Sequence, residues 1–97
     1  MREQILELVR ESVLELNEEL SYPELESPGE TTVLHGGETG LDSLSLVALI
    51  VDLERRVNDA TGQAVVLADE KAMSERNSPY RTVAALTDFV CGRLERP

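Results

Sequence analysis

Apolar residues recur at helical spacing in three separate stretches of the chain. In the first, from Arg2 to about Leu20, Glu and Arg fill the opposite face and no Gly or Pro interrupts the pattern. The last starts at Ser78-Pro79, where Ser can cap a helix and Pro fits its first position. Both patterns predict amphipathic helices. Their apolar positions are Ile5, Leu8, Val9, Val13, Leu16 and Leu20 in the first, and Val83, Leu86, Phe89, Val90 and Leu94 in the last.

The middle stretch, from Asp42 to about Ala60, is apolar almost all round. Asp42 suits the N-cap, because its carboxylate can accept free amide hydrogens, and Gly62 suits a left-handed C-cap. So small a domain can hardly enclose a whole helix, so one stripe is predicted to enter the core and the other to form an exposed contact surface. The core stripe is Leu46, Leu49, Ile50, Leu53 and Val57, and the contact stripe is Leu44, Val47, Ala48, Val51 and Arg55.

A connection rich in Gly and Pro, from Ser21 to Leu41, separates the first two helices. A short further helix is predicted over Asp69–Glu75. The pattern predicts an all-α fold in one domain over residues 1–97: a small four-helix bundle of three main helices and a short third one, with a long loop between helices 1 and 2. Three apolar residues are expected to hold this loop on the core: Leu25, Val33 and Leu34.

The charge balance narrows the class of partner. The 97 residues include 9 Lys and Arg against 19 Asp and Glu, for a net charge of -10. Such a surface disfavours nucleic acid and anionic membranes and favours basic proteins. Cys91 is the single cysteine, which excludes an intrachain disulfide, and we expect a buried thiol there. Because neither a signal peptide nor a membrane-spanning segment is evident, we expect a cytoplasmic monomer without membrane insertion.

Ser43 is the residue to which a chemical role is assigned. It is predicted to open the middle helix, where free amide hydrogens and the positive end of the helix dipole favour a phosphate group. A nucleophilic serine would need a base and an oxyanion hole, but the only histidine is His35 in the loop, and no G-x-S-x-G motif occurs. We therefore expect no enzymatic activity and no catalytic residues. The scattered carboxylates predict no metal site.

The residues around Ser43 resemble the acyl carrier protein family. The similarity lies in Gly40-Leu41-Asp42-Ser43-Leu44 and in the apolar positions Val47, Leu49, Leu53 and Val57 that follow, and it extends over nearly the whole chain. The resemblance implies that Ser43, beside Asp42, receives 4'-phosphopantetheine from coenzyme A through a phosphopantetheinyl transferase (a holo-carrier synthase). The arm would hold acyl groups as thioesters for delivery to acyl-loading and acyl-transferring enzymes.

The sequence also departs from the usual pattern of that family. Ser45 and Ala48 occupy positions where the family commonly has acidic residues, and Arg55 and Arg56 follow. The resemblance therefore implies a specialised carrier for a lipid, lipopolysaccharide or secondary-metabolite pathway. Two alternatives are an unmodified helical interaction module that uses the contact stripe to bind a partner helix and a small hydrolase. Modification of Ser43 separates the first of these from the carrier hypothesis.

Overall fold

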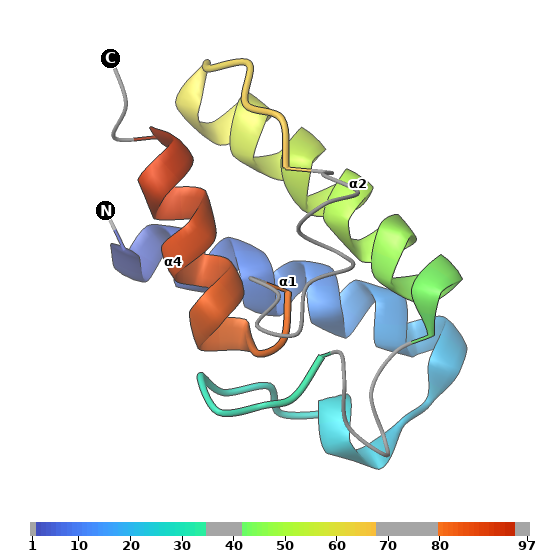
Figure 1. Ribbon diagram of the computed structural model, residues 1–97. Helices are drawn as coiled ribbons and strands as arrows, with labels where there is room; N and C mark the ends of the chain where they lie inside the picture. Colours follow the sequence, from blue (N-terminus) through green and yellow to red (C-terminus); the bar gives the residue numbers. More distant parts are fainter. Residues whose placement is uncertain (1, 35–41, 68–79, 95–97) are drawn as a thin grey trace.

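The described helices form an all-α arrangement (Figure 1). The computed structural model describes residues 2–34, 42–67 and 80–94. These contain helices α1 (Arg2–Leu20), α2 (Ser43–Thr61) and α4 (Val83–Leu94), and the single 3-10 turn η1 (Pro23–Leu25). No strand occurs among them, so the all-α class is confirmed, whereas the predicted four-helix bundle is not, because the described ranges hold three α-helices. The short helix predicted over Asp69–Glu75 lies outside the described residues.

Helix α1 packs against both α2 and α4. Its amphipathic pattern explains this position, because the apolar face must be covered. All five residues of the predicted core stripe of α2 are buried, and each fully buried aliphatic side chain stabilises the fold by roughly 1.5–3 kcal/mol. The predicted core stripe of α2 is thus confirmed, whereas four of the predicted apolar positions of α1 and α4 are only partly buried against the core: Leu8, Leu16, Leu20 and Phe89. The buried apolar residues of the other two helices are Ile5, Val9 and Val13 in α1, and Val83, Leu86, Val90 and Leu94 in α4.

A buried asparagine ends α1 and turns the chain. The Asn17 side chain donates a hydrogen bond to the carbonyl of Tyr22 (3.0 Å) and accepts one from the Tyr22 amide (2.7 Å). The amide of Ser21 donates to the Asn17 carbonyl, and Ser21 adopts a left-handed conformation with φ of 57°. The Asn17 side chain therefore satisfies both backbone polar groups of Tyr22, directly after the helix ends.

The long loop returns to the start of α4 through an antiparallel bridge between Val33 and Thr82. The Leu34 amide donates to the carbonyl of Arg81 (2.8 Å). Leu25 and Leu34 are buried, as predicted. The prediction for Val33 is wrong, because this side chain is 40% exposed. Successive side chains of extended backbone point to opposite sides, so burial of Leu34 turns Val33 outward.

Helix α4 begins at Val83, later than the predicted start at Ser78-Pro79. Residues 78 and 79 are themselves outside the described part, but residues 80–82 are not helical. The bridge to Val33 holds Thr82 in an extended conformation. The Thr82 hydroxyl accepts a hydrogen bond from the Ala85 amide (3.1 Å), as the side chain of a helix-capping residue does. The long-range pairing therefore decides where this helix starts.

The packing predictions for Tyr80, just before α4, and for Cys91, within α4, have different outcomes. Tyr80 is buried, as expected of a packing residue, with its ring edge against Phe89 at a centroid distance of 5.7 Å. Its hydroxyl donates to the carbonyl of Leu67. Cys91 is only partly buried against the core, so the prediction of a fully buried thiol is wrong.

None of the helices in the described ranges combines the length and apolar character needed to cross a membrane.

Candidate functional site

Asp42 caps the N-terminus of α2, as predicted. Its backbone is extended, with φ of -72° and ψ of 171°, and its carboxylate accepts a hydrogen bond from the Ser45 amide at 2.7 Å. This hydrogen bond lowers the pKa of the Asp42 carboxyl below its ordinary value, because it favours the charged form. At the other end of α2, Gly62 adopts the predicted left-handed conformation, with φ of 71°. Both ends of the helix are therefore defined by local capping.

Replacing Asp42 by alanine should lower the thermal midpoint of unfolding at neutral pH. The folded-state pKa is lowered, so the carboxylate stabilises the fold above its unfolded pKa of about 4 and loses this effect as the pH falls through the lower, folded value. The gap between wild type and Asp42→Ala should narrow as thermal scans go from pH 7 toward pH 3. Asp42→Asn retains an acceptor without titration and is the control. A gap that stays constant over this range would contradict the role of the charge.

Ser43 is the first residue of α2 and directly follows the capping aspartate. Its backbone position is the predicted one, but its side chain lies outside what the structure describes. Residues 35–41, which include His35 and precede the cap, also lie outside the described residues. The first-turn amides of a helix have no intrahelical acceptors, and the positive end of the dipole lies there. The position of residue 43 is therefore one that favours a negatively charged substituent.

An exposed apolar surface follows Ser43 along α2. Leu44 is 81% exposed, Val51 53% and Val47 39%, and Ala48 is also exposed. We call these four residues the α2 patch. Arg55, at the end of the same stripe, is exposed and pairs with Asp52 at 2.8 Å on its own helix. The predicted division of α2 into a buried and an exposed apolar face is thus confirmed, and contiguous exposed apolar residues are typical of interaction surfaces.

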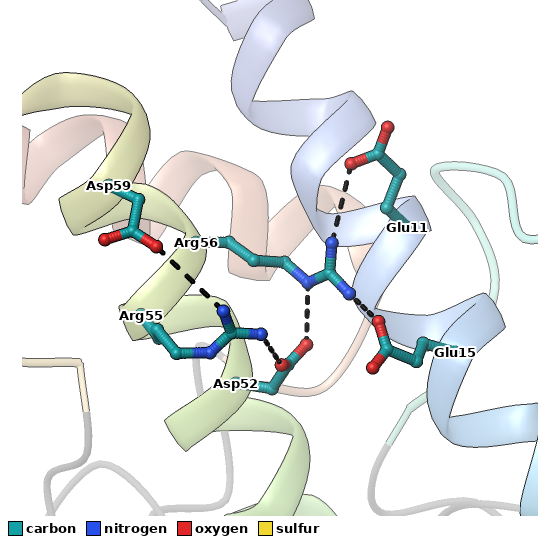
Figure 2. A network of polar contacts seen from close by, with 6 residues as sticks. All are labelled: Glu11, Glu15, Asp52, Arg55, Arg56 and Asp59. Atoms are coloured by element: carbon teal, nitrogen blue, oxygen red, sulfur yellow. Dashed lines mark hydrogen bonds and ion pairs between the residues drawn. The ribbon is translucent and has the colours of Figure 1, made fainter.

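Arg56 has a role that its place in the sequence did not indicate. Its guanidinium donates to Asp52 of the same helix at 2.8 Å and pairs with Glu15 and, at 3.8 Å, with Glu11, both on α1 (Figure 2). The Arg56 side chain is only 20% exposed, but those of Glu11 and Glu15 are 54% and 57% exposed, so solvent still screens its two ion pairs to α1. Arg56 therefore connects α1 with α2 instead of facing a partner.

A cleft of about 220 Å³ opens between α1 and α2, next to the α2 patch. Ser12 in its lining is 1% exposed, and its Oγ has no hydrogen-bond partner among the described residues. The sequence pattern did not predict this cleft, although Ser12, a serine within the apolar stripe of α1, is a signal for it. We call it the α1–α2 cleft; its lining comprises Ser12, Glu15, Leu16, Glu19, Ala48, Leu49 and Asp52.

The described part of the chain holds no group of three or more His, Cys, Asp or Glu side chains arranged to bind a metal ion. Comparisons of the chain with models of known protein families, with curated proteins and with solved structures found no match. Three features of the chain itself bear on its function: a capped helix start at residue 43, the α2 patch and the α1–α2 cleft.

Proposed function

We propose that the chain is an acyl carrier protein whose Ser43 carries 4'-phosphopantetheine. The observation that carries this proposal is the position of Ser43, between the capping Asp42 and the exposed Leu44 at the start of α2. The helix start supplies free amides and a positive dipole end for the phosphodiester. A buried core stripe holds the same helix in place, so an arm attached there has a fixed base.

Attachment uses the hydroxyl of Ser43 as the group that is modified. Its oxygen forms a bond to the pantetheine-side phosphorus of coenzyme A, the pyrophosphate bond breaks, adenosine bisphosphate leaves, and a transferase takes up the serine proton. The thiol of the attached arm would hold acyl groups as thioesters. Asp42 keeps the helix start ordered through its hydrogen bond to the Ser45 amide. The α2 patch offers apolar contact to the transferase and to enzymes that load or remove the acyl group.

The finer features of this proposal follow from the sequence. We assign the short third helix to Asp69–Glu75, which makes the fold a four-helix bundle. Ser45, Ala48 and Arg55 replace the acidic side chains common on this helix in carriers, which supports a specialised lipid, lipopolysaccharide or secondary-metabolite pathway. The proposed carrier is a cytoplasmic monomer and a covalent substrate of its partner enzymes.

Incubation with coenzyme A and a broad-specificity phosphopantetheinyl transferase tests the proposal. Intact-mass spectrometry should show the gain of one phosphopantetheine group. A known carrier protein in the same reaction shows that the transferase is active. An unchanged mass beside a fully modified control would contradict the proposal and favour the second candidate.

The second candidate function is that of an unmodified helical interaction module. Exposure of Leu44, Val47 and Val51 favours it, because an apolar helix face can bind a partner helix without any modification of Ser43. This candidate uses the same surface and differs only in the chemistry at residue 43. The mass measurement therefore separates the two.

A charge placed on the α2 patch should slow the modification of Ser43. Val51 lies two helical turns, about 12 Å, beyond Ser43 and is 53% exposed, so Val51→Glu should disturb docking without entering the core. We expect kcat/KM of the transferase for the protein to fall by about tenfold, the size of effect found at central interface residues. Initial rates of mass gain measure this change.

Leu14→Glu is the matched control for this substitution. Leu14 is 40% exposed on α1 and does not line the cleft between α1 and α2, so the same charge is added off the α2 patch. The Leu14→Glu protein should gain phosphopantetheine at the same initial rate as the wild-type protein. Equal rates for all three proteins would show that the patch does not contact the transferase, and loss of helical circular dichroism in Val51→Glu would place Val51 in the core.

A further inference from the structure

The α1–α2 cleft is continuous with the proposed docking surface. Ala48 belongs to both the α2 patch and the cleft lining. The apolar part of the lining consists of Leu16, Ala48 and Leu49, from both helices. An enzyme seated on the α2 patch would therefore lie directly beside the cleft.

The polar groups of the cleft are rich in hydrogen-bond acceptors. Glu15, Glu19 and Asp52 contribute carboxylates. Arg56 pairs with Glu15, Asp52 and Glu11, and Arg55 also pairs with Asp52, so two guanidinium groups stand against four carboxylates, those of Glu11, Glu15, Glu19 and Asp52 (Figure 2). Glu19 makes no ion pair within the described ranges. Negative charge is therefore in excess at the cleft, which disfavours an anionic occupant and favours a cation.

Ser12 adds an independent sign that the cleft receives a polar ligand. Ser12 is 1% exposed, and its Oγ has no hydrogen-bond partner in the described part of the chain. Nearly all buried polar atoms of folded proteins have partners, because an unmade hydrogen bond in the interior is costly. The Oγ atom itself has almost no accessible surface, so the N–H group of a ligand in the cleft would satisfy this hydroxyl after the side chains around it move slightly apart.

We infer that the α1–α2 cleft binds an arginine side chain of the enzyme that docks on the α2 patch. This rests on the proposed function, which supplies that docking surface. The methylene stem of arginine can lie on Leu16 and Ala48, as such stems do on apolar surfaces. Its guanidinium has five donors and no acceptor, which suits the Glu19 carboxylate and the Ser12 hydroxyl together. A lysine ammonium has three donors and lacks the planar fork that pairs with a carboxylate at two points.

Titration of the unmodified, full-length, 15N-labelled protein with N-acetylarginine amide tests the inference by NMR. We expect saturable shifts for the amides of cleft residues such as Ser12, Leu16 and Ala48, and none for those of α4. N-acetylcitrulline amide has nearly the same shape without the charge and should cause no saturable shift. Equal shifts with both compounds, saturation elsewhere on the protein, or no saturation up to the solubility limit would overturn the inference.

Two substitutions identify the groups that bind. Glu19→Gln should raise the dissociation constant about threefold, the effect of one exposed charge pair. Ser12→Ala should raise it about fivefold through loss of one hydrogen bond, and should raise the midpoint of thermal unfolding by removing an unpaired buried hydroxyl. Glu18→Gln, an exposed neighbour outside the cleft lining, is the control and should leave binding unchanged. Unchanged binding in both cleft variants would contradict the assigned contacts.

The arginine test and the test of the proposed function can fail separately. Binding is measured on protein that carries no phosphopantetheine, so its outcome does not depend on modification of Ser43. A protein that gains the phosphopantetheine mass but does not bind the arginine probe would retain the carrier function and lose only this contact. If the protein binds the probe but gains no mass, the cleft remains a site that binds a basic side chain, and the proposed carrier function is contradicted.

Discussion

A Ser43→Ala variant is expected to gain no phosphopantetheine under conditions that convert the wild-type protein completely. Alanine lacks the oxygen that forms the phosphoester bond, so the expected loss is total and not a reduced rate. Alanine is a good helix former, and Asp42 supplies the cap of α2, so the fold should be retained. Intact-mass spectrometry measures the loss, and circular dichroism confirms that the variant is folded.

Ser45→Ala provides the matched control for this variant. Ser45 lies two residues further along α2, and its amide, which donates to Asp42 at 2.7 Å, is retained in the Ser45→Ala variant. We expect the Ser45→Ala protein to be modified like the wild type. A Ser43→Ala protein that still gains one phosphopantetheine group would place the attachment at another residue and contradict the assignment.

Leu53→Ala is expected to remove about 3 kcal/mol from the free energy of unfolding. Leu53 is fully buried in the core stripe of α2, and truncation of a buried leucine loses its burial and leaves a cavity. A domain of this size has few kcal/mol to lose, so this variant should unfold at a much lower urea concentration. Urea denaturation followed by circular dichroism measures the difference.

Val51→Ala tests the opposite face of the same helix. Val51 lies two residues before Leu53 and is 53% exposed, so its truncation should change the free energy of unfolding by less than about 0.5 kcal/mol. The contrast between the two variants measures the division of α2 into a core face and an exposed face. Similar losses for both would show that the patch is packed against protein and is not free to dock.

Local sequence signals account for most of the described helices. The 3.6-residue period placed Val9, Leu53 and Val90 in the core, because a helix buries one stripe whatever its partners are. Asp42 and Gly62 marked the ends of α2, because capping depends on the nearest few residues. The exposed stripe of α2 was predictable as well, since so short a chain cannot surround a helix that is apolar on two faces.

Features that depend on distant residues were not predictable in this way. The start of α4 is set by pairing of Thr82 with Val33, which lies far away in the sequence, and the same pairing turns Val33 outward. The contact of Arg56 with Glu15 needs the packing of α1 on α2. The cleft above Ser12 likewise exists only between the two assembled helices. Sequence periodicity specifies faces, not which faces meet.

The central claim is that Ser43 is the attachment point of a phosphopantetheine arm. Peptide mapping by tandem mass spectrometry, on the protein isolated from the cells that naturally produce it, tests this most directly. We predict that the peptide containing Ser43 carries phosphopantetheine, with or without an acyl group as a thioester. Recovery of this peptide only in unmodified form, from cells whose other carrier proteins are modified, would contradict the claim.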